Sequence, residues 1–462
     1  MNRLTRRQAI FEAGKGFAGL ALAGMSATAA TLETARAKNI IYIFNHGGVS
    51  HVDTWDPKPT LTRLSGQTVP PGFVEGLKTA RIDFRKAIMR GSPWQFPRHG
   101  QGGLEISALF PHLSKHADRL AVIRSCYSDA FDHAPAMFTS CTGSQFPGRP
   151  SLGAWLSYGL GSENKDLPSF VVMSDGAMKS GAGAYGSGFL PATYQGTMFR
   201  GGSKSPVLNL ANPKGIDNEA QRETLDYIND LNKHHLASRE EDTALDARIK
   251  AYELAFRMQA EAPGAVDISS ESEATQKLYG IGEPMTDDFG RKCLLARRLV
   301  ERGVRTVQLF FGTNLGDDWD DAHNDLLGSH NKMAHKSDKP IAGLLTDLAA
   351  RGLLDSTLIV WNSEFGRTPL AEGKNGRDHH PYGYSMWMAG AGIKGGRALG
   401  ATDEFGLRAV EQPKSIHDVH ATILRLMGVE HTKLTWRYQS RDMRLTDVHG
   451  EGEFTNWLLS RS

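Results

Sequence analysis

The chain has 462 residues, of which 40% are hydrophobic and 23% charged, and its formal net charge is +2. This composition is that of a globular protein with enough chain for a large core, and the near-neutral charge argues against a nucleic-acid-binding protein. The three cysteines, Cys126, Cys141 and Cys293, exclude a disulfide framework and leave room for one pair.

The first 37 residues have the pattern of an export signal. Arg6 and Arg7 precede a mildly apolar stretch rich in glycine and alanine, and residues 35–37 ("ARA") resemble a cleavage site. Twin arginines before such a stretch are typical of Tat export. We therefore expect a Tat signal peptide over residues 1–37 and a periplasmic or secreted domain over 38–462. No later apolar run is long enough to span a membrane.

Six apolar, β-branched runs follow along the chain and predict buried strands. In chain order they are "NIIYIFN", "RLAVIRSCYS", "LPSFVVMS", "VRTVQLFF", "STLIVWNS" and "YSMWMAG". Helical patterns lie between them, such as "DKPIAGLLTDLAARGLLD" over residues 338–355. This alternation predicts an α/β fold with a mostly parallel sheet covered by helices. Residues from about 215 to 275 are polar and helical in pattern, which indicates a helical insertion.

Carboxylates and imidazoles follow several of these strands. Because functional groups in parallel sheets gather beyond the carboxyl ends of the strands, we expect these side chains to meet. Imidazole suits zinc-like ions and carboxylate suits harder ions, so the pattern predicts a site for one or two divalent ions, zinc, calcium or magnesium. The predicted ligands are a subset of the following residues: His46, Asp320, Asp321, His323, Glu364, His379 and His380. His417 and His420 lie three residues apart on a predicted helix, and this spacing is compatible either with metal binding or with a position in the core.

Two segments resemble sulfatases of the alkaline phosphatase superfamily. "DKPIAGLLTDLAARGLLDSTLIVWNSEFG" is similar to their carboxyl-terminal core, and "HAPAMFTSCTG" from His133 is similar to the helix that carries their nucleophile. An exported sulfatase-like family, known as domain of unknown function 1501, is more similar still. Its motifs "WDPKP", "GRPSLGAWLSYGLGSEN", "YELAFRMQ", "EFGRTP", "GRDHHP" and "RLTDVHG" recur here in order. The resemblance implies a three-layer α/β/α sandwich like that of alkaline phosphatase.

The resemblance also implies that the ligands have changed. His133 stands at the position of the sulfatase nucleophile, Met137 stands where those enzymes have arginine, and Asn45-His46 replaces two metal-binding aspartates. Four roles for His133 therefore stay open. As a neutral ring it can bind a metal or attack the substrate directly, and as a cation it can hold a sulfate or phosphate. It can also serve only as a cap at the start of its helix.

Two classes of function follow from this pattern. The first is a metal-dependent hydrolase of sulfate or phosphate esters, acting outside the cytoplasm on a small anionic ester or on a sulfated or phosphorylated glycan. Arg367, Arg377 or Lys58 would then hold the anion, with His133 in the catalytic site. The second class is a non-catalytic protein that binds anionic ligands on a decayed sulfatase frame. The polar motifs "EFGRTP" and "GRDHHP" favour the enzyme.

Overall fold

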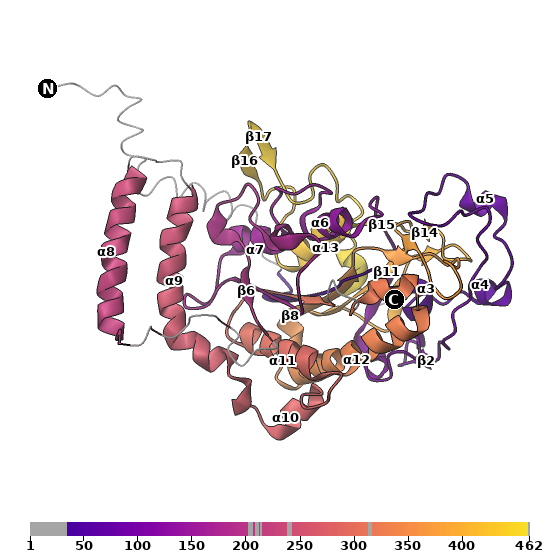
Figure 1. Cartoon of the computed structure of the whole chain (residues 1–462), viewed down its shortest axis with the longest axis horizontal. Coiled ribbons are helices and arrows are strands. Elements are labelled where there is room, and N and C mark those ends of the chain that lie inside the picture. The colour runs from indigo at the N-terminus through magenta and orange to yellow at the C-terminus, as the bar shows by residue number, and fades with distance from the viewer. Residues whose placement is uncertain are drawn as a thin grey trace.

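A computed structural model describes residues 35–201, 207, 212, 215–237, 243–312 and 317–460. The predicted export signal lies almost wholly outside the described residues. All six predicted strands are present, and they form the centre of the fold (Figure 1): β1 (Asn39–Asn45), β4 (Ala121–Tyr127), β5 (Phe170–Ser174), β7 (Thr306–Phe311), β8 (Thr357–Ser363) and β11 (Tyr384–Gly390).

These strands belong to one nine-stranded sheet. Its order is β12 (Arg397–Leu399), β4, β11, β8, β1, β7, β5 and β6 (Thr197–Phe199), and β15 (Lys414–Ser415) also pairs with β4. Every pairing is parallel except the two that β11 makes with β4 and β8. The sheet is therefore mostly parallel, as the sequence predicts.

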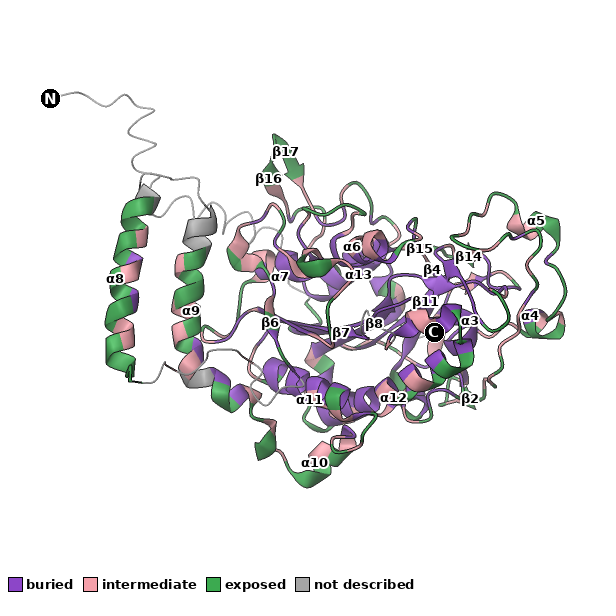
Figure 2. Cartoon of the chain, viewed as in Figure 1, coloured by how far each residue is buried: buried purple, intermediate pink, exposed green. Residues whose placement is uncertain are grey.

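Both faces of the sheet are covered, because side chains alternate along each strand and all of β1 is buried. Ile41 and Ile43 join the core beneath α11 (Asp287–Glu301) and α12 (Leu326–Ala350). Tyr42 and Phe44 join the core beneath three helices on the opposite face: α6 (His133–Thr142), α7 (Leu152–Leu160) and α13 (Ile416–Leu426). Figures 1 and 2 show the resulting three layers, with the burial concentrated along the sheet. The predicted α/β/α sandwich is confirmed.

A pair of long helices lies beside this sandwich. α8 (Asn218–Ala237) and α9 (Thr243–Val266) run side by side within the segment predicted as a helical insertion, and α10 (Glu273–Leu278) follows them (Figure 1). Arg222 of α8 pairs with Glu253 of α9 at 2.7 Å. Among the described residues of the pair, the end of α9 enters the core through Met258, Ala262 and Ala265.

Helix α12 is longer than its sequence pattern indicates. It begins at Leu326, where the Asp325 side chain accepts a hydrogen bond from the Gly328 N–H, and it continues through Pro340. An interior proline costs a helix about 3 kcal/mol. Asp338 and Ile341 beside it are buried, so packing against the sheet and the neighbouring chain offsets this cost.

Short elements complete the fold. They are α3 (His51–Thr54), α4 (Pro59–Arg63), α5 (Pro71–Val74), α14 (Thr455–Leu459) and four two-stranded pairs: β2 (Arg98–His99) with β3 (Leu104–Glu105), β9 (Gly366–Arg367) with β10 (His379–His380), β13 (Ala401–Thr402) with β14 (Ala409–Glu411), and β16 (Trp436–Tyr438) with β17 (Arg441–Met443). Cys126, Cys141 and Cys293 are free and buried. Among the described helices, none has the length and apolarity that a membrane crossing needs.

The start of the described chain is tied to the domain. The backbone N–H groups of Arg36 and Ala37 both donate to the Leu426 carbonyl, at 2.8 and 2.9 Å, and Ala37 is buried. The predicted cleavage segment is thus joined to the end of α13.

Candidate metal centre

Five segments bring polar side chains to one edge of the sheet. Asn45, the last residue of β1, pairs with Phe311 of β7 and Ser363 of β8, so these strands end level with one another. β4 runs in the same direction and leads to α6, while β11 runs the other way and is preceded at this edge by β10. The carboxyl ends of the parallel strands therefore position the residues that follow them, as the sequence predicts.

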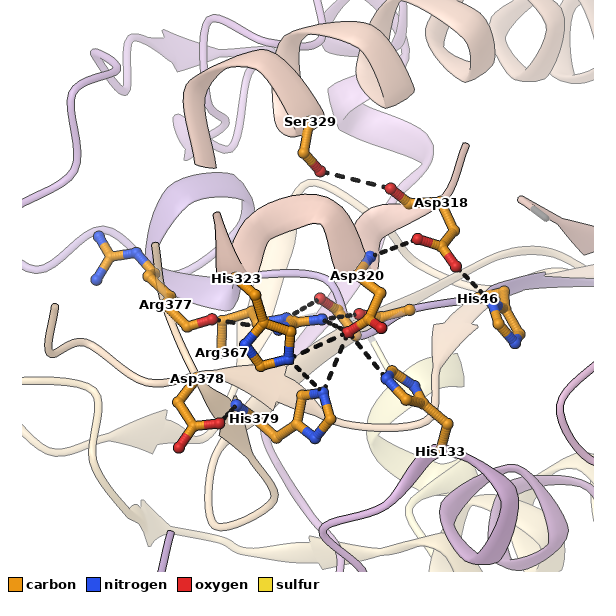
Figure 3. A network of polar contacts seen from close by, with 12 residues as sticks. His46, His133, Asp318, Asp320, His323, Ser329, Arg367, Arg377, Asp378 and His379 are labelled. Carbon is orange, nitrogen blue, oxygen red and sulfur yellow. Dashed lines mark hydrogen bonds and ion pairs between the residues drawn. The ribbon is translucent and has the colours of Figure 1, made fainter. Parts of the chain in front are cut away.

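Asp320 lies at the centre of the cluster (Figure 3). Its Oδ1 atom is 2.9 Å from His133 Nε2, 3.1 Å from His379 Nε2 and 3.3 Å from His323 Nε2. Arg367 Nη2 also donates to Oδ1, at 2.6 Å. One carboxylate oxygen thus faces three imidazole nitrogens and one guanidinium.

An acceptor lies behind each of the three imidazoles. His133 Nδ1 donates to Glu364 Oε1 at 2.8 Å, and His379 Nδ1 donates to the Phe131 carbonyl at 2.7 Å. His323 Nδ1 pairs with Glu372. A carbonyl or carboxylate behind one ring nitrogen fixes the tautomer and turns the other nitrogen toward the centre, which is the usual arrangement of metal-binding histidines.

The pKa shifts follow from this packing. Burial alone would raise the pKa of Glu364, but the hydrogen bond and charge of His133 outweigh burial and lower that pKa to about 2. Burial alone would lower the pKa of His133, but Asp320 and Glu364 raise it. Burial lowers the pKa of His379 to about 3, so this ring is neutral near pH 7. His133 and the Arg367 guanidinium help to hold the pKa of Asp320 well below its usual range, against its own burial.

His46 lies at the side of the cluster and belongs to a second pair. Its ring stacks on that of His133 with 5.9 Å between centroids, and its Nδ1 is 3.3 Å from Asp318 Oδ2. Its buried Nε2 has no hydrogen-bond partner among the described residues. His46 thus retains one free nitrogen beside the cluster.

Glu364 has a supporting position, although the sequence predicts it as a ligand. Its Oε1 accepts hydrogen bonds from His133 and from the Gly47 N–H, and its Oε2 accepts from Ser363 Oγ. Both oxygens are therefore occupied by protein donors. Its carboxylate holds His133 and the turn after β1 in place.

Two of the predicted ligands lie outside the cluster. His379 and His380 are neighbours in β10, so their side chains leave opposite faces of the strand. His380 Nε2 donates to the Leu407 carbonyl, and its ring stacks on His51. Asp321 is half-buried, and within the described residues no hydrogen bond or ion pair joins it to the three imidazoles.

Arg367 and Arg377 are buried and paired with other groups of the protein. Both are 0% exposed. Arg367 donates to the carbonyls of Gly47 and Gly48 and to Asp320, while Arg377 binds Asp53 and the Thr368 carbonyl. The two guanidiniums therefore fix the loops of the site. Lys58, the third predicted anion-binding residue, pairs with Asp56 at 3.0 Å.

Lys179 is a partly exposed cation beside Asp320, on the side of the cluster that is open to solvent, and the sequence analysis did not predict it. Its Nζ is 2.8 Å from Asp320 Oδ2, and its side chain is 27% exposed. It lies in the loop after β5, whose first residue, Asp175, accepts hydrogen bonds from the Gly312 N–H and from Lys292. Its position after a strand is a sequence signal of the same kind as that of the predicted ligands.

Within the described residues, two groups of ligand atoms are close enough to hold a metal ion. The first is His133, Asp320 and His379, and the second is His323, Asp378 and His379. The second group is the weaker candidate, because Asp378 already accepts backbone hydrogen bonds from Arg81, Ile82 and His379. His417 and His420 lie apart from both groups, and His420 donates to the Ser140 carbonyl inside the core.

The fold and the site thus define an α/β/α protein with a buried histidine–aspartate cluster that could hold a metal ion. The sequence pattern of the family described as "Protein of unknown function (DUF1501)" matches residues 37–453, and the chain belongs to this family. The motifs predict this family, and the match confirms it, whereas its sulfatase-like and exported character stays a prediction. A comparison with curated proteins finds no match.

Similar solved structures include several hydrolases and a synthase. The lipoteichoic acid synthase LtaP from Listeria monocytogenes is 10% identical over 87% of this chain and 74% of its own, with a TM-score of 0.37. The PsFucS1 sulfatase from Pseudoalteromonas sp. is 12% identical over 88% and 72%, with a TM-score of 0.36. The alkaline phosphatase of the Antarctic bacterium TAB5 is 10% identical over 86% and 99%, with a TM-score of 0.34. At these scores the likenesses carry no argument about chemistry.

Proposed function

We propose that the protein is a metal-dependent hydrolase of sulfate or phosphate esters that acts outside the cytoplasm. The main evidence for a bound metal ion is the orientation of the His379 ring. Its Nδ1 must donate to the Phe131 carbonyl, so in the neutral ring Nε2 keeps its lone pair. That lone pair faces Asp320 Oδ1 at 3.1 Å and His323 Nε2 at 2.8 Å. A cation between these atoms would turn a repulsive contact into a binding site.

The residues present fit a divalent ion. Zinc lies about 2.0–2.2 Å from nitrogen and oxygen ligands, and atoms that are 2.9–3.1 Å apart can share one ion at such distances. His133, Asp320 and His379 would hold it, with His323 beside them. Two imidazoles with one carboxylate favour zinc over calcium or magnesium. The acceptors behind the rings supply the supporting shell that such ions require.

The ester chemistry is supported by the place of His133 in the sequence. "HAPAMFTSCTG" is similar to the helix that begins at the nucleophile of sulfatases, and α6 begins at His133 here. A bound divalent ion polarises an ester and lowers the pKa of water. The side chain of the N-cap residue Asp132 accepts no hydrogen bond from the first turn, so the N–H groups of that turn are available to an anion.

Lys179 would complete the anion-binding site. It is the charged group on the exposed side of Asp320, and its ammonium can hold a sulfate or phosphate oxygen. We propose it in place of Arg367 and Arg377, whose donors are already used. The loop that carries it is anchored through Asp175, which keeps the ammonium at the open side.

His133 acts as a ligand in this proposal and not as a nucleophile. Its two ring nitrogens face Glu364 and Asp320 at 2.8 and 2.9 Å, so the ring is clamped between two carboxylates. A nucleophilic nitrogen would need to face the substrate. The reaction therefore proceeds without a covalent phospho-histidine.

The experiment is reconstitution of the chelator-treated protein. Aryl sulfate and aryl phosphate are supplied with zinc, calcium or magnesium in turn. We expect turnover of at least one ester that depends on the added ion, and no added phosphoryl mass on the α6 peptide. Metal-loaded protein that hydrolyses neither ester would contradict the hydrolase and favour a binding protein for anionic ligands.

A further inference from the structure

One exposed segment beside the cluster carries more positive charge than the whole chain. Residues 77–87, here called the basic loop, contain Lys78, Arg81, Arg85 and Lys86 against the single acid Asp83, a net charge of +3, whereas the chain carries +2. All four basic residues are exposed. The loop follows α5 at the edge of the molecule, where Figure 2 shows largely exposed chain.

The loop is a built element with an apolar underside. Phe84 is buried, and Leu77 and Ile82 pack with it on the small core formed by Leu370, Phe405 and Leu407. The apolar side chains therefore anchor the loop while its cationic side chains remain in solvent.

Backbone hydrogen bonds fix the loop against the metal centre. The N–H groups of Arg81 and Ile82 donate to Asp378 Oδ2 at 2.6 and 3.1 Å, and Asp378 directly precedes His379. The Lys78 N–H donates to the Tyr382 hydroxyl at 3.0 Å. The basic loop is thus held by the same segment that supplies a ligand of the cluster.

Two side-chain contacts continue this connection. Arg81 Nη1 is 3.7 Å from Glu372 Oε1, and the other oxygen of Glu372 binds His323. Tyr382 packs edge-on against Phe131 at 5.6 Å, and the Phe131 carbonyl holds His379. The basic loop is therefore connected to the partners of both His323 and His379.

We propose that the basic loop binds the unreacted anionic groups of a polysaccharide chain that carries several sulfate or phosphate esters, while one ester occupies the metal centre. This inference rests on the proposed function and names its substrate class. A single small ester needs one or two cations, which Lys179 and the ion provide. Three further exposed cations, Lys78, Arg85 and Lys86, suit the neighbouring esters of a polymer. Single-stranded nucleic acid is disfavoured, because Phe84, the one aromatic residue of the loop, is buried and offers no stacking surface.

The test compares two triple variants with the same change in net charge. Lys78, Arg85 and Lys86 are replaced by Gln in the first, and the dispersed exposed residues Lys277, Lys433 and Arg437 in the second. Binding of fluorescein-labelled dextran sulfate is measured by anisotropy at low and at physiological salt. We expect about tenfold weaker binding for the loop variant at low salt, a smaller difference at higher salt, and wild-type binding for the control.

Hydrolysis of an aryl ester is measured on the same proteins and should be unchanged in the loop variant. Equal dextran sulfate binding by all three proteins would overturn the inference. So would tighter binding of an oligonucleotide of equal charge, or loss of aryl-ester turnover in the loop variant. If the wild type hydrolyses no ester, the proposed function fails, yet the binding comparison still decides whether the loop holds a polyanion.

Discussion

Replacement of Glu364 by glutamine tests whether this buried carboxylate organises the cluster. The amide oxygen can still accept a hydrogen bond, so the main change is the loss of one negative charge. Glu364 is 1% exposed and lies 2.8 Å from both His133 Nδ1 and the Gly47 N–H. We expect a large loss of stability even in the presence of a chelator, because His133 then loses its charged partner.

The magnitude follows from the pKa of Glu364, which folding lowers from 4.5 to about 2. One pKa unit corresponds to about 1.4 kcal/mol, so the carboxylate contributes roughly 3 kcal/mol at pH 7. Removal of one partner from a buried ion pair costs about 3–5 kcal/mol, which agrees. Because the folded pKa is depressed, this contribution is present above pH 4.5 and is lost as the pH falls toward 2.

Urea unfolding at pH 7 with chelator provides the assay. Glu364→Gln should lower the free energy of unfolding by about 3 kcal/mol, whereas the same change at the exposed residue Glu404 should lower it by less than about 0.5 kcal/mol. A Glu364→Gln protein as stable as the Glu404→Gln control would refute the reasoning.

Three further predictions concern the substrate, acid stability and export. Lys179→Ala should raise KM for an aryl ester about tenfold without loss of bound metal. Lys336→Ala, which breaks a similar ion pair with Asp317, should leave KM unchanged. Equal KM values in the two variants would reject the role of Lys179. Burial lowers the pKa of His420 to about 3, so the folded protein keeps this ring neutral while the unfolded chain protonates it below pH 6.5. The free energy of unfolding therefore falls by up to about 1.4 kcal/mol per pH unit as the pH drops below 6.5. His420→Gln should flatten the decline in urea stability between pH 6 and 4, and an unchanged slope would contradict this. Replacement of Arg6 and Arg7 by Lys should leave precursor in the cytoplasm on fractionation, and normal export would exclude the Tat signal.

The fold could be predicted in detail because its strands are buried on both faces. Such strands appear as continuous apolar runs, and each of the six runs became a strand. Helix α12 shows where this reasoning stops. Pro340 marks a helix start in a local pattern, but burial of its neighbours holds the helix together back to Leu326. Tertiary packing of this kind leaves no local sequence signal.

The location of the site could also be predicted, since strand ends converge in a parallel sheet. The sequence did not predict which of two adjacent residues would face the centre of the cluster. His379 enters the cluster and His380 leaves it, and Asp320 enters while Asp321 stays outside. In each case a shift of one residue along the backbone would exchange the side chain that faces the cluster for its neighbour, and the local sequence does not determine that shift.

The roles of charged residues were the least predictable feature. Arg367 and Arg377 follow a strand and suit an anion by chemistry, but buried carbonyls and Asp53 use their donors. Conversely, Lys179 acquires its importance only from its distance to Asp320. Such partners come from segments far apart in the sequence, so only the folded structure reveals them.

Metal analysis of two neighbouring histidine variants tests the central claim most directly. The wild type, His379→Gln and His380→Gln are purified without chelator and reconstituted with zinc. Their metal content is then measured by inductively coupled plasma mass spectrometry. We predict at least one bound ion per chain in the wild type, loss of that ion in His379→Gln, and full retention in His380→Gln, whose ring faces away from the cluster. Absence of the ion from the reconstituted wild type, or its full retention in His379→Gln, would contradict the metal centre.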